Sequence, residues 1–367
     1  MTAALFVPLQ LRDLTIDNRI VVSPMCQYSA HEGHATDWHS MHLGQMAQSG
    51  AGLVLLEATA VTPEGRISPD CLGLWSDAHA ESLARVLRSV REWSSRARFG
   101  VQLAHAGRKG STFAPWKGQG QVSVAQGGWQ NVAPSPLPFR ESEAVPTQLS
   151  ETEIAGLIQS FVDAAIRADR IGLDAIELHA AHGYLMHQFL SPLSNRRSDA
   201  WGGSLENRMR LVLEVFDAVR AAWPSSKPLG VRVSATDWVD GGWDLSQTVE
   251  LSAALQRRGC DWLDVSSGGL DPRQKITTGP GYQVPFSAAV KQATGMATMA
   301  VGMITDPGQA NEIVESGQAD MVALARAFLA NPRWPWLAAA ALGEQVSVPP
   351  QYERGVDGSI VGRAGQN

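Results

Sequence analysis

The sequence predicts a single-domain (β/α)8 barrel, an α/β fold. Eight short apolar runs recur along its 367 residues, with helix-like segments or loops between them. Several runs are nearly continuous in Val, Leu, Ile and Ala, which is typical of strands buried on both faces of a parallel sheet. Eight strands that alternate with helices favour a closed barrel. A doubly wound open sheet is the alternative, but no GxGxxG follows the first run, and this absence makes the open sheet the less favoured fold.

The connecting segments carry signals for helix ends. Ser150 and Glu153 form a capping box before an apolar stripe of helical spacing. Asp306 is a candidate N-cap with Pro307 at the first helical position, and Gly317 occupies the place where a glycine would end that helix. The runs expected to be strands are residues 19–24, 51–58, 99–105, 173–179, 229–234, 261–267, 297–302 and 320–326.

The segment 107–150 interrupts this regular order. It is rich in Gly, Pro, Ser and Gln, and a stretch of that length after the third strand is either a functional excursion or partly disordered. We expect a loop with a small hairpin over the barrel mouth, where Trp116 and Trp129 are candidates to line the entrance. The barrel is expected to occupy residues 1–355, and residues 356–367 to form a flexible C-terminal extension.

Composition narrows the class of protein. The net charge of −6 argues against nucleic acid as the main partner, because phosphate binding needs a basic face. Three widely spaced cysteines, Cys26, Cys71 and Cys260, fit a reduced cytoplasm better than a disulfide framework. We see neither a signal peptide nor an apolar run near 18 residues, so a cytoplasmic protein without a membrane partner is expected.

Polar residues stand at the C-terminal ends of the apolar runs, and these ends meet at one mouth in a barrel, where active sites lie. Gly302 and Arg326 suit a phosphate, Gln102 can bind an amide-like edge, and Arg232 needs an anion beside it in its apolar strand. Such a set describes the binding of FMN. The polar strand ends are Ser23–Tyr28, Glu57, Gln102 with His105, His179, Arg232, Ser266 with Ser267, Gly302 and Arg326.

The stretch ELHAAHGYL, residues 177–185, leaves two interpretations open. Its histidines, three residues apart, are either metal ligands or hydrogen-bond donors. A metal site needs further ligands. His105, or Asp37 with His39, could be proposed as these further ligands, whereas Glu177 is expected to face the other way along the strand. The metal interpretation is the weaker one, and no metal is expected.

Four stretches carry a family resemblance: SPMCQYSA (23–30), QLAHAGRKG (102–110), ELHAAHGYL with SPLSNRRSDAWGGSLENR (177–208) and QYERG (351–355). With these, the chain resembles the Old Yellow Enzyme family of FMN-dependent ene-reductases, and within it the shorter bacterial subgroup that includes xenobiotic reductases. The resemblance extends from about Leu5 to Arg354.

The resemblance implies an FMN held by the strand ends, with NADPH or NADH as reductant. Cys26 should lie near flavin N5 and O4 and tune the redox potential. The implied cofactor contacts are Ser23, Pro24 and Met25 against the isoalloxazine, Ala58 to Ala60 and Gln102 at the pyrimidine ring, Arg232 at N1 and O2, and Gly302, Ala325 and Arg326 at the phosphate.

It also implies substrate contacts and a reaction. Hydride should pass from FMN to the β-carbon of an α,β-unsaturated carbonyl compound, while His179 and His182 donate hydrogen bonds to the carbonyl oxygen. Tyr184 should protonate the α-carbon, and Tyr28 should cover the substrate. Arg354 should enter the active site of a neighbouring protomer, in a homodimer or homotetramer.

Three points remain open at this level. Lys109, in the loop after the third strand, either meets an anionic substrate or cofactor phosphate or is a solvated lysine. The chain continues past QYERG with VDGSIVGRAGQN, where relatives end. Position 325 is Ala, where relatives usually have Gly, and this alanine would be strained if the position required a positive φ. Alternative functions are another FMN barrel reductase acting on tRNA, a metal-dependent barrel hydrolase, and a flavin sensor without turnover.

Overall fold

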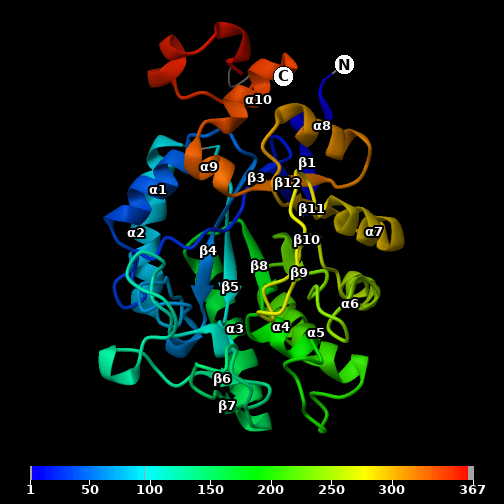
Figure 1. The fold of residues 1–367 in the computed structure, drawn as a ribbon. Coiled ribbons are helices and arrows are strands. Elements are labelled where there is room, and N and C mark those ends of the chain that lie inside the picture. Colours follow the sequence, from blue (N-terminus) through cyan, green and yellow to red (C-terminus); the bar gives the residue numbers. More distant parts are fainter. Residues whose placement is uncertain (1, 95, 363–367) are drawn as a thin grey trace.

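The computed structural model describes residues 2–94 and 96–362. In this part of the chain, eight parallel strands close into a barrel with a helix after each strand, which confirms the predicted (β/α)8 fold (Figure 1). Each predicted run overlaps one of them, although β4 and β8 extend past the predicted ends at 58 and 179. The barrel strands, in chain order, are β3 (Ile20–Val22), β4 (Leu53–Ala60), β5 (Phe99–Ala104), β8 (Ala175–Ala180), β9 (Leu229–Ser234), β10 (Trp262–Ser266), β11 (Thr298–Val301) and β12 (Met321–Leu324).

The helices begin and end largely where the capping signals predict. The Ser150 hydroxyl accepts a hydrogen bond from the Glu153 backbone, and Asp306 accepts one from Gln309. Of the described helices, none is long and apolar enough to cross a membrane. The helices are α1 (Asp37–Ala47), α2 (Asp77–Trp93), α3 (Glu151–Arg170), α4 (Leu185–Leu190), α5 (Leu205–Ala222), α6 (Leu245–Arg257), α7 (Val284–Thr294), α8 (Pro307–Glu315), α9 (Arg326–Ala330) and α10 (Trp334–Leu342).

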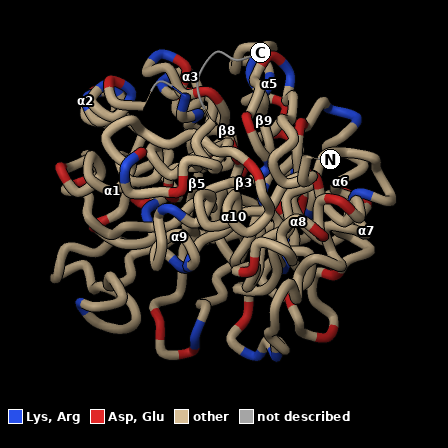
Figure 2. The backbone as a smooth tube through the Cα atoms, turned by 90° about the horizontal axis from the view of Figure 1, so that it is seen from above, with Lys and Arg blue, Asp and Glu red and all other residues tan. Residues whose placement is uncertain are grey.

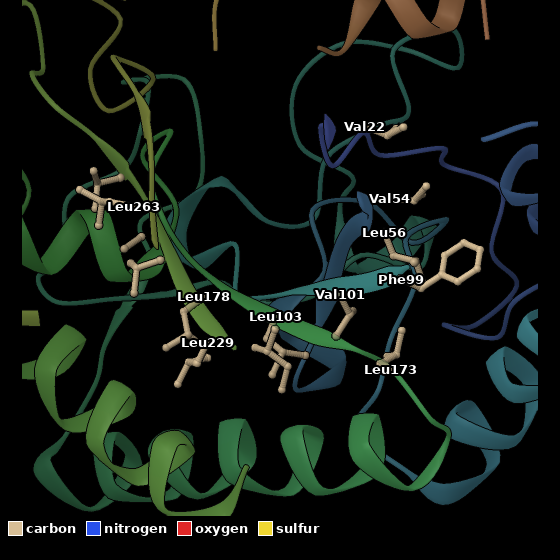
Figure 3. Close-up of a cluster of buried hydrophobic side chains, with 14 of the residues drawn as sticks. Val22, Val54, Leu56, Phe99, Val101, Leu103, Leu173, Leu178, Leu229 and Leu263 are labelled. Atoms are coloured by element: carbon tan, nitrogen blue, oxygen red, sulfur yellow. The ribbon is translucent and has the colours of Figure 1, made fainter. Parts of the chain in front are cut away.

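Side chains alternate between the two faces of each barrel strand. Those facing outward join the helices in the main hydrophobic core, and Figure 3 shows Leu103, Leu178 and Leu229 on this side of the strands. Those facing inward form a second cluster near the N-terminal ends of the strands, where Trp262 packs with residues of the hairpin formed by β1 (Leu9–Leu11) and β2 (Leu14–Ile16). The hairpin therefore closes the bottom of the barrel and leaves the opposite end for a site.

Two segments outside the barrel differ from expectation. The excursion after β5 contains β6 (Val132–Ala133) and β7 (Thr147–Gln148), but these pair in parallel, so they do not form a hairpin. The C-terminal segment lies at the end of the molecule opposite to them (Figure 1). Over residues 356–362 it is packed rather than free, because Ile360 is buried and bonds through its carbonyl to Val346. Residues 363–367 lie outside the described residues.

Acidic and basic residues are interspersed along the outer helices and loops (Figure 2). The chain has 30 Lys and Arg against 36 Asp and Glu. Charges of both signs thus cover the rim around the barrel.

Candidate active site

The turn after β8 brings three predicted residues together above the barrel. The ring of His179 lies 5.2 Å from that of His182 and 4.9 Å from that of Tyr184, centroid to centroid, and both pairs meet edge to face. His182 adopts a left-handed φ of 58°, which turns the chain between the strand and α4. All three side chains can thus face one point above the mouth.

One hydrogen bond of His179 indicates its tautomer. Its Nδ1 accepts a bond of 3.3 Å from the Ala181 backbone N–H, so the proton sits on Nε2. Burial, followed by the charge of Arg232, lowers the pKa of both His179 and His182 well below the ordinary value. At neutral pH both rings are uncharged, and each offers one N–H donor.

His182 is held by its backbone and by its ring. The Ser234 hydroxyl accepts from the His182 N–H at 2.9 Å, and His182 Nε2 lies 2.8 Å from Ser266 Oγ. A serine hydroxyl can donate to this nitrogen, in which case the proton is on Nδ1. Gln283 Oε1 lies 3.4 Å from Ser266 Oγ and accepts a hydrogen bond from the neighbouring Ser267 at 2.6 Å.

Buried groups support this turn from below. His187 Nδ1 accepts from the Gly183 N–H at 2.9 Å, and His187 Nε2 lies 2.8 Å from Asp237 Oδ1. Both side chains are fully buried. Gly269 packs so closely that an added Cβ would lie 2.6 Å from the His182 Cα. Any larger residue there would displace the turn.

The Lys109 side chain is hydrogen-bonded to two backbone carbonyl groups and is not a solvated loop lysine. Its Nζ donates to the carbonyl oxygens of His182 and Gly269, at 2.7 Å each, and lies 5.2 Å from the centre of the Tyr184 ring. The ammonium therefore ties the turn after β8 to the loop after β10. Burial lowers the pKa of Lys109 to about 7, and in its protonated form one further donor remains for a ligand.

A small apolar cluster forms the wall beside Tyr184. Cys26 and Tyr28 from the loop after β3 pack there with Ala58 of β4 and the buried Cys71. Burial raises the pKa of the Tyr184 hydroxyl well above its ordinary value, and the neighbouring Cys26 raises it further. The phenol is therefore protonated at any physiological pH.

The entrance is covered by aromatic residues. Tyr28 has a φ of 48° and meets Trp116 edge to face, with 5.7 Å between the ring centres. Trp116 therefore reaches the mouth from the excursion, as predicted for a lining residue. Trp129 instead stacks with Arg66, whose guanidinium lies 4.8 Å from its ring.

Below the mouth lies a buried polar layer. Gln102 Nε2 donates to Glu177 Oε1 at 2.8 Å, while Arg232 Nη1 donates to Ser23 Oγ at 3.2 Å. Arg232 Nε also lies 3.1 Å from Asp264 Oδ2. The prediction that Glu177 faces away from His179 was wrong, because residues two apart in a strand share one face.

The predicted phosphate residues line one cavity of about 420 Å³ between β11 and α9. Gly302 has a φ of 123°, and an added Cβ would lie 2.7 Å from Gln283 Nε2, so a larger residue here would be strained and would displace Gln283. Ala325 has a φ of −109° and is not strained. With the exposed Arg326 beside them, these residues fit the phosphate of a bound FMN.

The other predicted residues divide into strand-end residues beside the mouth and candidate metal ligands that lie apart from His179. Pro24 and Met25 follow β3, and Ala60 ends β4 beside the mouth. His39 Nε2 lies 3.3 Å from Glu57 Oε1, and His105 Nδ1 accepts from the Gly107 N–H, so neither joins His179. Residues 2–94 and 96–362 contain no group of three His, Cys, Asp or Glu placed to hold a metal ion.

Arg354 does not reach the mouth of its own barrel. It lies in the 3-10 helix Pro350–Gly355, where Tyr352 packs on Trp336 of α10 and Glu353 borders a cleft with Trp93. Trp93 is the last residue of α2, which leads into β5, so this end of the helix lies at the N-terminal end of the strands. The arginine is exposed on the face of the molecule away from His179.

Comparison with known proteins decides the family. A family model described as the NADH:flavin oxidoreductase / NADH oxidase family matches residues 4–345. The chain belongs to this family. The predicted membership of the Old Yellow Enzyme family is thereby confirmed, and the protein is an NAD(P)H-dependent flavin oxidoreductase.

Relatives of this flavin oxidoreductase cover nearly its whole length. An NADPH dehydrogenase of Geobacillus thermodenitrificans is 44% identical over 357 residues, which is 97% of this chain and 99% of the relative. An NADPH dehydrogenase of Bacillus subtilis is 43% identical, over 97% and 100% of the two chains. The solved structure of morphinone reductase superposes with a TM-score of 0.78 at 29% identity, covering 98% of this chain and 93% of its own.

Sequence reasoning missed the residues that support the site. Asp264, His187 and Asp237 were not selected, although all are fully buried polar groups. A signal existed for Asp264, because it precedes the strand-end Ser266 by two residues and must share its inward face. The sequence carried no signal for the His187–Asp237 pair, whose members lie 50 residues apart and meet through the fold.

Proposed function

We propose that this flavin oxidoreductase reduces the activated C=C bond of α,β-unsaturated carbonyl compounds, with FMN as cofactor and NADPH or NADH as reductant. The observation that supports this most is the group of two uncharged imidazoles and one protonated phenol around a single point. Such a set can stabilise an oxyanion and deliver a proton in the same site.

The residues present fit FMN at the barrel mouth. Gly302, Ala325 and Arg326 would hold its phosphate, Gln102 and Arg232 would face its ring, and Ser23 to Cys26 would lie along its edge. Bound FMN would supply the hydride that reduces the β-carbon. Arg232 supplies a fixed positive charge at the ring, which favours negative charge on the reduced cofactor.

The protein's own groups would then act on the substrate. His179 Nε2–H and one N–H of His182 donate to the carbonyl oxygen, where negative charge develops during reduction. Tyr184 donates its phenolic proton to the α-carbon. Tyr28 covers the substrate together with Trp116, and the remaining donor of Lys109 is open to an anionic substituent.

The reaction can be tested directly on the purified protein. We expect bound flavin to be visible in the absorption spectrum, and cyclohexenone to accelerate the anaerobic oxidation of NADPH with formation of cyclohexanone. A saturated ketone is the matched control, since it has the carbonyl but no C=C bond. Flavin-bound protein that oxidises NADPH no faster with cyclohexenone than with the saturated ketone would contradict the proposed substrate class.

We further propose a cytoplasmic homodimer or homotetramer in which Arg354 enters the active site of a neighbouring copy. Its exposed position, away from the mouth of its own barrel, supports this arrangement. Truncation before Gln351 should therefore raise the KM for enones, and Arg354→Ala should reproduce the effect. Steady-state kinetics check this, with Arg257→Ala on the exposed face of α6 as control. Wild-type kinetics in both variants would exclude a shared site.

A further inference from the structure

The buried layer below the mouth holds one cation and two acids. Arg232 of β9 pairs with Asp264 of β10, and Glu177 of β8 lies on the same inward side of the barrel. The side chains of Glu177 and Asp264 are 0% exposed. If both acids were ionised, the layer would carry a net negative charge out of reach of water, which is costly.

The contacts distinguish the two acids. Asp264 faces the guanidinium, 3.1 Å from its Nε. Glu177 meets only neutral donors, Gln102 Nε2 at 2.8 Å and Trp262 Nε1 at 3.3 Å. A carboxylate beside a cation keeps its charge, and one among neutral donors gains less from ionisation. Glu177 is therefore the acid that takes a proton most readily.

The remaining neighbours offer Glu177 no other charge. Gln102 on β5 and Trp262 on β10 do not titrate at physiological pH, and His179, two residues along β8, is uncharged. Burial, and then the charge of Asp264, raise the pKa of Glu177 to about 8, with Arg232 acting in the opposite direction. Burial also raises the pKa of Asp264.

We propose that Glu177 holds a proton in the resting protein and takes one up on cofactor reduction when the pH is high enough to have removed it. This inference rests on the proposed placement of the flavin ring against Arg232. Glu177 then acts on the flavin through Arg232, and its protonation sets how the redox potential of the flavin depends on pH.

Linkage gives the direction of the effect. Reduction places negative charge beside Arg232, and the guanidinium then neutralises Glu177 less, so ionised Glu177 becomes less favourable. Reciprocally, electrons bind more tightly when Glu177 is protonated. Reduction below the Glu177 pKa consumes two electrons and one proton at the cofactor. Between that pKa and the higher pKa that Glu177 acquires when the cofactor is reduced, Glu177 takes a second proton from solvent.

The midpoint potential of the bound flavin tests this, by spectroelectrochemistry from about pH 6 to about pH 10. For two electrons, each proton contributes about 30 mV per pH unit. We expect that slope in the wild type at low pH, and twice that slope from about pH 8 up to the higher pKa that Glu177 has beside the reduced flavin. Glu177→Gln should keep the single slope throughout. Glu206→Gln, whose side chain is 85% exposed on α5, should retain the break of the wild type.

Each outcome bears on Glu177. A constant one-proton slope in the wild type, or an unchanged break in Glu177→Gln, would overturn the inference. Trp262→Phe provides a second test, because loss of one donor to the ionised carboxylate should move the break to higher pH. An unmoved break would also count against it. A protein that shows the break but reduces no enone would refute the proposed reaction and retain this inference.

Discussion

Tyr184→Phe should slow the oxidation of reduced enzyme by cyclohexenone by about 10²–10⁴-fold, the usual contribution of a general acid. The substitution removes only the hydroxyl, and the ring can keep its contacts with His179 and Lys109. Because the pKa of Tyr184 is raised well above its ordinary value, the wild-type rate of this step should not fall between about pH 6 and about pH 9 through loss of its proton. Anaerobic stopped-flow absorbance of the flavin measures the rate.

Two internal controls identify the proton as the cause. Reduction of the flavin by NADPH needs no proton from Tyr184, so its rate should equal that of the wild type. Oxidation by ferricyanide, which accepts electrons without forming a C–H bond, should also be unchanged. If Tyr184→Phe slowed ferricyanide and cyclohexenone equally, the hydroxyl would be acting on the cofactor or on the fold.

The barrel was predictable because eight apolar runs repeat the same signal, but the hairpin β1–β2 was not. Its turn, Arg12 and Asp13, lacks the glycine or asparagine that such turns favour, and Arg12 adopts a φ of 52°. The Arg12 guanidinium is held by Asp261 at 2.7 Å, 249 residues away. Tertiary contacts of this kind stabilise a local conformation that the local sequence does not indicate.

The site divides in the same way. His179, His182 and Tyr184 lie within one motif, and their family resemblance identifies them together. Their protonation states depend on the surrounding fold, since burial, and then the charge of Arg232, lower the pKa of both histidines. The members of the polar layer around Glu177 follow from the alternation of side chains along each strand. Applied to Glu177, this alternation places it on the same face as His179, contrary to the prediction. Strand pairing then decides which inward residues meet.

His179→Ala should weaken the binding of phenols that mimic the enolate and lower the rate of enone reduction by about 10²–10³-fold, as loss of an oxyanion donor does. FMN should remain bound, because its proposed contacts come from other strands. Titration of the flavin absorbance with a para-substituted phenol measures the affinity. His179→Asn is the matched variant, since an amide N–H can replace part of the lost hydrogen bond.

The two variants together separate hydrogen bonding from ion pairing. Nδ1 of His179 is occupied by the Ala181 N–H and the pKa of the ring is low, so the wild-type ring acts as a neutral donor. His179→Asn should then bind phenols more tightly than His179→Ala. If the phenol were instead held by a charged imidazolium, asparagine would be no better than alanine, and wild-type affinity would fall as the pH rose through the histidine pKa. Unchanged phenol affinity in His179→Ala would remove His179 from the oxyanion site altogether.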